Sequence, residues 1–334
     1  MKKTYYLFNP GRLSRKDNTL KFVPVDENGV EGQPRYIPVE GVSDLYVFGS
    51  LDANSSLYNF MGKNRITVHF FDYYEHYTGS FYPKEYLLAG KMQVAQTLYY
   101  ADKKKRLVLA HRFVEGASFN MVKNLRYYQN RGKDLEPYIC KMEEYQQQLA
   151  GCKDIPTLMG FEGNIRQVYY EAFDEILREF AMEGRSKQPP LNEINTLISF
   201  GNMMCYTLCL DMIYHTQLNP TISFLHEPGT RRYSLALDLA EIFKPILVDR
   251  TIFRVVNRKE IKQNDFDMQL NYCMIKESGK KTFIAAFEDR LKETIQHRTL
   301  KKHVSYKSLV KLECYKLTKH LMEMEEYKPF KIWW

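Results

Sequence analysis

Residues 223–250 read SFLHEPGTRRYSLALDLAEIFKPILVDR and place a lone histidine and two carboxylates beside a turn and an apolar stripe. The Pro-Gly pair supplies the fixed and the permissive backbone angles of a sharp turn, so His226 is expected at the end of an element. Ser234 is expected to cap the helix that follows, and Pro245 to end or kink it. The stretch therefore predicts a histidine-bearing loop followed by a short helix.

Two acids lie on one flank of this predicted helix. Asp238 and Glu241 are about 60° apart around its axis, beside a stripe that is expected to be buried. The stripe consists of Leu235, Leu239 and Ile242. A buried carboxylate is costly unless a cation, a partner or a proton compensates, and a divalent metal is one such cation. The alternative is that His226 is a hydrogen-bonded loop histidine, while the acids face water or pair with Arg231 and Arg232.

Length and charge favour two domains and an anionic partner. The 334 residues are 44% hydrophobic, which is enough for one large or two ordinary domains. Lys and Arg number 48 against 40 Asp and Glu, which gives a formal net charge of +8. Such a balance suits a polyanion such as nucleic acid.

Cysteine spacing and hydropathy indicate a reducing compartment. The six cysteines form no CxxC pair, so we expect free thiols rather than disulfides. The N-terminal segment lacks the apolar core of a signal peptide, and no apolar run is expected to reach the ~20 residues of a membrane span. We therefore expect a cytoplasmic protein without membrane contact.

The residue pattern changes after Tyr82 and Pro83. Before this point, short aromatic and β-branched runs alternate with turn signals, and one amphipathic segment, residues 55–61, predicts a short helix. After it, helical periodicity continues to about residue 326. We predict an α+β protein with a small β-rich domain over residues 1–84 and a larger all-α-helical catalytic domain over residues 85–334.

Basic and aromatic residues interleave at the start of the helical domain. Lys103, Lys104 and Lys105 follow Tyr99 and Tyr100. Cations bind phosphates and flat rings stack on unpaired bases, so this segment has the chemistry to follow a nucleic-acid backbone. A solvated helical face explains the same pattern equally well.

An acidic residue between two glycines marks another candidate. Residues 157–185 read as one long helix in which Gly160 and Gly163 flank Glu162. Glycine costs helical stability, so the pair suggests that something approaches the backbone closely. The alternative is an i,i+4 pair between Glu162 and Arg166 on a solvated face.

Two later segments are notably apolar. Residues 193–215 predict a buried helix whose Tyr206 is brought towards His226 by the next turn, although most tyrosines of this kind only pack. The chain ends in KPFKIWW, which is unlike a solvated tail. We expect Trp333 and Trp334 to dock on a surface of this chain or of a partner.

Together these motifs resemble one family, the CRISPR-associated adaptation integrase Cas1, over nearly the whole chain. The segments that carry the resemblance are YYLFNPGRLSRKDNTLKF, LMGFEGNIRQVYYEAF, NTLISFGNMMCY, the stretch quoted first, and YKPF near the end. The opening and the ending look most like a type I-B-related branch. The resemblance implies a homodimer, formed through the N-terminal domain, that assembles with the small protein Cas2 on a double-stranded DNA prespacer and CRISPR repeat DNA.

The resemblance also implies a site for Mg²⁺ or Mn²⁺. Its ligands would be Glu162 of the FEG motif, His226 of the LH motif and Glu241 of the DLAE motif. Asp238 would be a supporting carboxylate or an alternative ligand, and Tyr206 corresponds to a tyrosine of the family's site. One imidazole and two carboxylates suit these hard cations better than structural zinc.

Two positions beside Glu162 depart from the family pattern. Ile165 and Arg166 stand where small residues are common, and we expect neither to touch the metal site. On the loop, Arg231 and Arg232 are expected to contact DNA together with the three lysines named above.

The implied reaction is attack by the 3′-OH of a short DNA fragment on the repeat boundary of a CRISPR array. A bound metal would lower the pKa of that hydroxyl and neutralise charge on the phosphodiester. With water as the nucleophile, the same site is a nuclease. Two other classes remain open: a metal-dependent nuclease of DNA or RNA that joins no ends, and a non-catalytic nucleic-acid scaffold.

Overall fold

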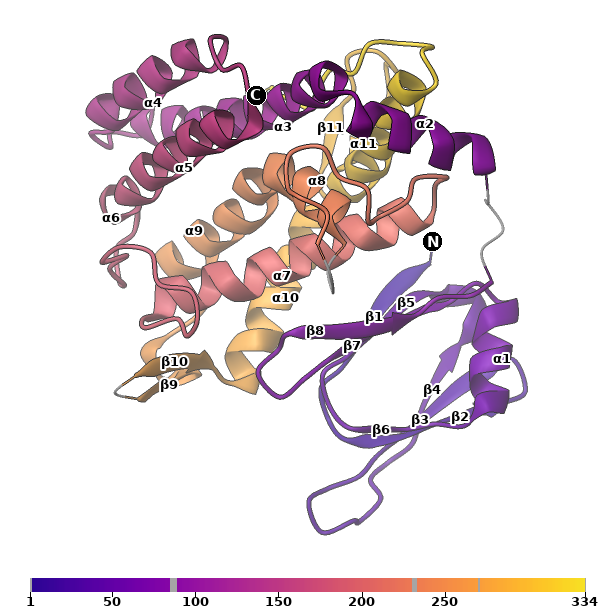
Figure 1. Ribbon diagram of the computed structural model, residues 1–334. Helices are drawn as coiled ribbons and strands as arrows, with labels where there is room; N and C mark the ends of the chain where they lie inside the picture. The colour runs from indigo at the N-terminus through magenta and orange to yellow at the C-terminus, as the bar shows by residue number, and fades with distance from the viewer. Residues whose placement is uncertain (1, 85–88, 230–232, 270, 334) are drawn as a thin grey trace. The chain divides into compact units, whose positions relative to one another are not determined.

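The computed structural model describes residues 2–84, 89–229, 233–269 and 271–333 (Figure 1). The chain divides into two compact units, Met1–Leu88 and Ala89–Trp334. The change of pattern in the sequence places the boundary after residue 84, a few residues before this division. Each unit has its own core and is described by itself.

The N-terminal unit contains two four-stranded sheets, with strand orders β1-β5-β7-β8 and β4-β3-β2-β6. The strands of the first sheet are β1 (Lys3–Leu7), β5 (Val42–Val47), β7 (Thr67–Phe71) and β8 (Tyr77–Phe81). Those of the second are β2 (Gly11–Lys16), β3 (Thr19–Pro24), β4 (Arg35–Pro38) and β6 (Leu51–Asp52). The first sheet is parallel except for β8, and the second is antiparallel except for the β2–β6 pair. The predicted β-rich character is confirmed.

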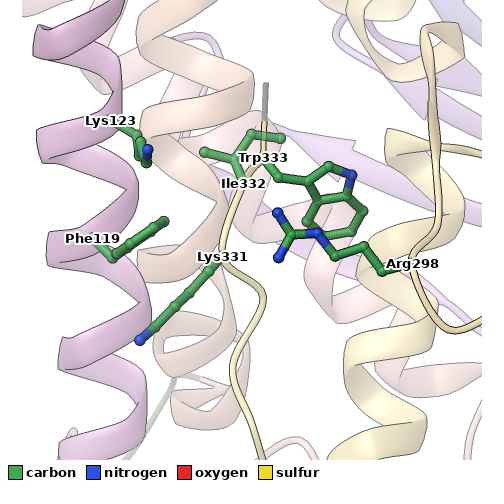
Figure 2. A pocket seen from close by; sticks show the side chains of 6 residues that line it. All are labelled: Phe119, Lys123, Arg298, Lys331, Ile332 and Trp333. Atoms are coloured by element: carbon green, nitrogen blue, oxygen red, sulfur yellow. The ribbon is translucent and has the colours of Figure 1, made fainter.

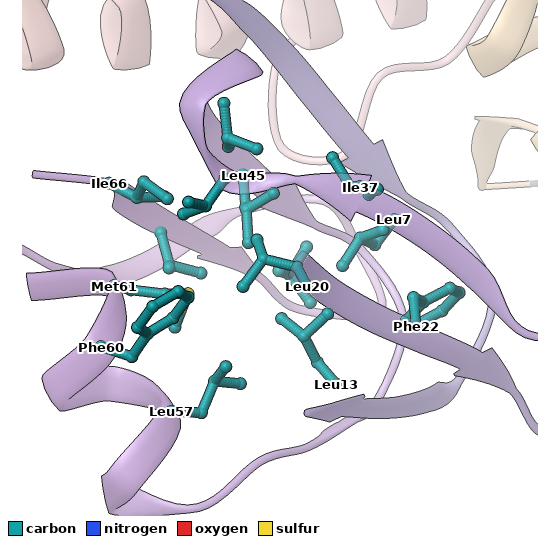
Figure 3. Close-up of a cluster of buried hydrophobic side chains, with 14 residues drawn as sticks. Leu7, Leu13, Leu20, Phe22, Ile37, Leu45, Leu57, Phe60, Met61 and Ile66 are labelled. Atoms are coloured by element: carbon teal, nitrogen blue, oxygen red, sulfur yellow. The ribbon is translucent and has the colours of Figure 1, made fainter. Parts of the chain in front are cut away.

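Helix α1 (Ser55–Lys63) closes the core of this unit. The side chain of Asn54 accepts a hydrogen bond from the Leu57 N–H at 3.0 Å and so caps its N-terminus. The apolar face of the helix packs with strand residues such as Leu13, Leu20 and Leu45 (Figure 3). The helix expected at residues 55–61 is confirmed.

The C-terminal unit is mainly helical. Its helices are α2 (Gly90–Ala101), α3 (Lys103–Gln129), α4 (Glu136–Leu149), α5 (Ile155–Glu171), α6 (Phe173–Ile176), α7 (Glu193–Tyr214), α8 (Ser234–Lys244), α9 (Arg250–Asn257), α10 (Glu277–Lys292) and α11 (Tyr306–Leu321). Two antiparallel ribbons, β9 (Phe266–Gln269) with β10 (Tyr272–Ile275) and β11 (Thr294–Gln296) with β12 (His303–Ser305), interrupt them. The prediction of an all-α-helical domain is therefore wrong in detail, because these four short strands lie within it.

The helix predicted over residues 157–185 is shorter in the structure. α5 ends at Glu171, and after the four residues of α6 the backbone becomes extended at Leu177. At this bend the rings of Tyr170 and Phe173 meet edge-on, with centroids 5.2 Å apart. Both side chains are buried, so burying this aromatic cluster accompanies the end of the helix.

Helix α7 packs against both α8 and α11. Gly201 makes its close packing feasible, since a Cβ there would lie 2.4 Å from Val248 Cγ1. With a mean hydropathy of 1.3, α7 is long and apolar enough to span a membrane, which contradicts the expectation that no segment is. The expectation missed it because polar residues are scattered along the helix. In the structure 78% of its most apolar window is buried, as in a core helix.

Candidate metal centre and catalytic site

The loop that precedes α8 is organised by Asp238. This fully buried carboxylate accepts hydrogen bonds from the backbone N–H groups of Phe224 (2.7 Å), Leu225 (3.0 Å) and His226 (3.0 Å). The same carboxylate lies 2.8 Å from Nδ1 of His226. An acceptor at Nδ1 places a proton there and leaves Nε2 as the donor atom for a ligand. Asp238 therefore orients the loop backbone and the imidazole of His226.

The imidazole of His226 is charged more easily than an ordinary histidine. Burial by itself lowers the pKa of His226, but the hydrogen bond and negative charge of Asp238, with Glu241 nearby, outweigh it and raise the pKa. Only 21% of the side chain is exposed. His226 therefore lies in a strongly anionic, half-buried setting.

Glu162 and Glu241 are joined by one cation. On α5, Arg166 Nε donates to Glu162 Oε1 at 2.8 Å, and Nη2 of the same guanidinium contacts both Glu162 and Glu241. On α8, Lys244 Nζ donates to the other oxygen of Glu241 at 2.7 Å. Because one nitrogen contacts both carboxylates, α5 and α8 bring these two acids together.

The expectation that Arg166 stays away from the site is therefore wrong. The Arg166 side chain is long enough to reach from α5 to α8. Its position one turn after Glu162 places it on the same face of α5 as Glu162, so that it can contact Glu241 on α8. The alternative of a solvated Glu162–Arg166 pair is half right, because the pair forms but each side chain is only 18% exposed. Within the described part of the chain, no atom lies within 4 Å of a Cβ built on Gly160 or Gly163, so no segment of that part makes the close approach expected at these glycines.

The charge balance keeps Glu241 ionised. Burial raises its pKa, but Arg166 and Lys244 outweigh burial, and His226 adds to their effect, so the pKa of Glu241 lies well below its usual range. Among the described residues, no group of three His, Cys, Asp or Glu side chains has the spacing of a metal site. The donor set nevertheless fits a hard divalent cation. Glu162 and Glu241 are neighbouring carboxylates that already share a cation, Arg166, and His226 adds an oriented imidazole.

Tyr206 on α7 and Arg106 on α3 hold the ends of the loop. Tyr206 Oη accepts a hydrogen bond from the Tyr233 N–H at 3.1 Å, immediately before α8. On the other side, Arg106 donates to the Phe224 carbonyl oxygen at 3.0 Å and to Glu227 at 2.7 Å. Tyr206 therefore supports the start of α8, which is a positioning role.

The predicted N-cap of α8 is wrong by one residue. Tyr233 occupies the N-cap position without a side-chain hydrogen bond, while the buried Ser234 donates to the Thr221 carbonyl oxygen at 2.9 Å. The hydroxyl thus closes the loop rather than capping the helix. The expected stop at Pro245 is confirmed: α8 ends at Lys244, and a π-helical segment, Pro245–Asp249, leads into α9.

The predicted DNA-contacting cations differ in their surroundings. Lys103 and Lys104 are exposed on the first turn of α3. Lys105 contacts Glu323 at 3.2 Å and lies over the Tyr99 ring at 4.6 Å, so part of its charge is neutralised. Arg231 and Arg232 lie outside the described residues.

Sequence reasoning missed two cations that shape the site. Lys244 follows Glu241 by three residues on one helix, a spacing that signals an ion pair. Arg106 continues the basic run of the preceding lysines, but its contact with the histidine loop spans 118 residues. The first pairing was readable from spacing, and the second depends on the tertiary fold.

Comparison with known proteins identifies the family. Residues 5–289 match the family model described as "CRISPR associated protein Cas1". A "CRISPR-associated endonuclease Cas1" of Fusobacterium nucleatum is 46% identical over 335 residues, covering 100% of this chain and 98% of the relative.

Solved structures share the fold over almost the whole chain. A CAS1 protein from Thermotoga maritima is 38% identical, with a TM-score of 0.85 and coverage of 97% of this chain and 98% of that one. A casposase bound to integration product is 20% identical, with a TM-score of 0.84 and coverage of 99% and 93%. The chain belongs to the Cas1 family of CRISPR-associated proteins.

Proposed function

We propose that this protein integrates DNA fragments into a CRISPR array by direct transesterification. The 3′-OH of the fragment attacks a phosphodiester at the repeat boundary, a new phosphodiester forms, and the displaced strand leaves with a free 3′-OH. The observation that carries the proposal is that one guanidinium joins Glu162 to Glu241, while the Asp238-oriented His226 lies close enough to Glu241 to interact with its charge. The name of the 46% identical relative, an endonuclease, supports phosphodiester chemistry.

Glu162, Glu241 and Nε2 of His226 are the proposed ligands of Mg²⁺ or Mn²⁺. When bound, such an ion lowers the pKa of a hydroxyl and offsets charge that develops on the phosphodiester. Asp238 holds the proton of His226 on Nδ1, so that Nε2 stays available. Arg166 and Lys244 keep Glu241 ionised, and a bound ion would compete with them for its carboxylate.

The proposed partners follow from charge and family. The formal net charge of +8 and the exposed Lys103 and Lys104 support binding to a double-stranded DNA prespacer and to CRISPR repeat DNA. The chain shares its fold with the Cas1 part of a solved Cas6-RT-Cas1–Cas2 complex, which supports Cas2 as a partner, and the homodimer is proposed from the sequence resemblance. Six free cysteines support a cytoplasmic, reducing location, and the burial of α7 supports a chain without membrane contact.

A second candidate is a metal-dependent nuclease, which the printed name of the relative favours. The difference lies only in the nucleophile, since water in place of a DNA 3′-OH gives hydrolysis. A non-catalytic scaffold is less favoured, because such a protein has no need of a buried Glu241 joined to Glu162 near an oriented imidazole.

A strand-transfer assay separates these readings. Labelled duplex, a plasmid with a CRISPR repeat, Cas2 and Mn²⁺ are incubated with the wild type and with Glu241→Gln, which keeps the shape of the side chain but removes its charge. We expect joined product from the wild type and none from the variant. Cleavage without joining would support the nuclease, and binding without either reaction would support the scaffold.

A further inference from the structure

A hollow of about 450 Å³ lies between α3 and the C-terminal segment (Figure 2). Phe119 and Lys123 face it from α3, and Arg298 reaches it from the connection between β11 and β12. The remaining lining comes from Lys331, Ile332 and Trp333. The hollow has the volume of a small-molecule site, and its lining combines cations with aromatic rings.

The walls of the hollow are held by buried hydrogen bonds. Fully buried Asn120 accepts from the Ile332 N–H at 2.9 Å and donates to the carbonyl oxygens of Ile242 (3.0 Å) and Phe330 (3.1 Å). The indole of Trp333 donates to the Gln296 carbonyl oxygen at 3.1 Å. Asn120 thus ties the C-terminal segment to α8 at the residue that follows Glu241.

The hollow carries positive charge that the protein does not neutralise. Lys331 donates to Glu115 at 2.7 Å. Within the described part of the chain, neither Lys123 nor Arg298 forms an ion pair with a carboxylate. Lys123 lies 5.7 Å from the centroid of the Phe119 ring, and Arg298 lies 5.0 Å from that of Trp333. Two cations therefore stand beside two rings, one pair on each wall.

We propose that this hollow binds one nucleotide of an unpaired DNA strand. The phosphate lies between Lys123 and Arg298, and the base stacks on the ring of Trp333. To make room for the base, the exposed Arg298 side chain moves off this ring and towards the phosphate. An acidic peptide would use the cations but leave the rings without a partner, whereas a nucleotide uses both. The assignment rests on the proposed function, since it names a contact for a DNA strand that the protein handles.

Intrinsic fluorescence provides a direct test, because Trp333 and Trp334 are the only two tryptophans of the chain. In a Trp334→Phe background, Trp333 is the sole reporter. Titration with a five-nucleotide oligothymidine in the absence of divalent metal should quench its emission to saturation. An abasic strand of equal length should bind more weakly and leave the emission unchanged.

Two further variants separate charge from stacking. The double change Lys123→Ala and Arg298→Ala should weaken binding and flatten the log–log salt slope by about 0.7, the value for one neutralised phosphate on a single strand. Trp333→Ala, followed by anisotropy of a labelled strand, should weaken binding about tenfold. Lys302→Ala, on the same connection as Arg298 but outside the lining, is the matched control and should bind as the wild type does.

Several outcomes would overturn the assignment. If the abasic strand or hexaglutamate quenched the Trp333 emission as much as the oligothymidine does, base stacking would be rejected. If thymidine monophosphate bound as tightly as the oligothymidine, the hollow would be a site for free nucleotides rather than for a DNA strand. Unchanged affinity in both variants, with wild-type circular dichroism, would reject the hollow altogether. None of these measurements needs catalysis, so a chain that binds the strand here but never joins DNA ends would refute only the proposed function.

Discussion

Replacing Asp238 with asparagine should disable the site by changing the tautomer of His226. One carboxylate oxygen accepts from the N–H groups of Phe224 and Leu225, and the other lies against the N–H and Nδ1 of His226. Asparagine offers only one acceptor. If its oxygen keeps the first pair of donors, its NH₂ group faces His226 and donates to Nδ1, which moves the imidazole proton to Nε2.

The structure sets the size of both effects. One buried N–H of the loop loses its acceptor, which costs about 1–3 kcal/mol, and the remaining bonds lose charge assistance, so we expect a loss of about 3 kcal/mol in the free energy of unfolding. A protonated Nε2 cannot bind a metal, so strand transfer should fall at least 100-fold, beyond the 10–100-fold usual for a residue that orients a ligand.

The assay combines strand transfer over a range of Mn²⁺ concentrations, thermal unfolding, and ¹⁵N NMR of the imidazole nitrogens. Asp102→Asn is a matched control, because Asp102 accepts backbone N–H bonds at the exposed N-cap of α3, where asparagine serves equally well. A variant at position 238 with wild-type rate, wild-type Mn²⁺ dependence and a proton still on Nδ1 would refute the reasoning.

Three other expectations can be measured on the same protein. Without metal, Arg166→Gln should unfold at a lower temperature than the wild type. Added Mn²⁺ should raise the unfolding temperature of the variant by more than that of the wild type, because the ion no longer competes with a guanidinium for the two carboxylates. Equal increases in the two proteins would show that Arg166 and the ion do not compete. Burial raises the pKa of Asp249 to about 7. The folded state therefore keeps a proton that the unfolded state releases near pH 4. The free energy of unfolding should decline as the pH rises from about 4 to 7. Asp249→Asn should remove that part of the slope in urea unfolding, and an unaltered slope would count against the buried carboxyl. Tyr206→Phe should slow strand transfer without abolishing it, because the hydroxyl accepts the Tyr233 N–H and so positions the start of α8. A wild-type protein–DNA adduct on a denaturing gel that disappears in this variant would instead make Tyr206 a nucleophile.

Local spacing made much of the site predictable. His226, Asp238 and Glu241 fall within one short stretch, where turn chemistry and helical periodicity indicate a loop, a helix and two acids on one flank. The pairing of His226 with Asp238 was not predicted, because it depends on how the loop folds back against the start of α8. The β-rich start of the chain was equally readable, because its strands alternate with strong turn signals.

Contacts between distant segments were not predictable. Arg166 reaches Glu241 because α5 packs near α8, and nothing in either local sequence specifies that approach. The resemblance to the family pointed the other way, since it placed small residues at this position. The ribbon β11–β12 was hidden for a different reason, because each of its strands has only three residues, too few to show alternation.

The burial of α7 has a consequence for the order in which the chain leaves the ribosome. This helix is as apolar as a membrane-spanning segment, and its neighbours α8 and α11 are synthesised after it. Until residue 321 has emerged, part of the α7 surface has no partner and is open to chaperones, to the membrane-insertion machinery or to other nascent chains. A premature stop between α7 and α8 would therefore yield an aggregating fragment rather than an inactive but folded one.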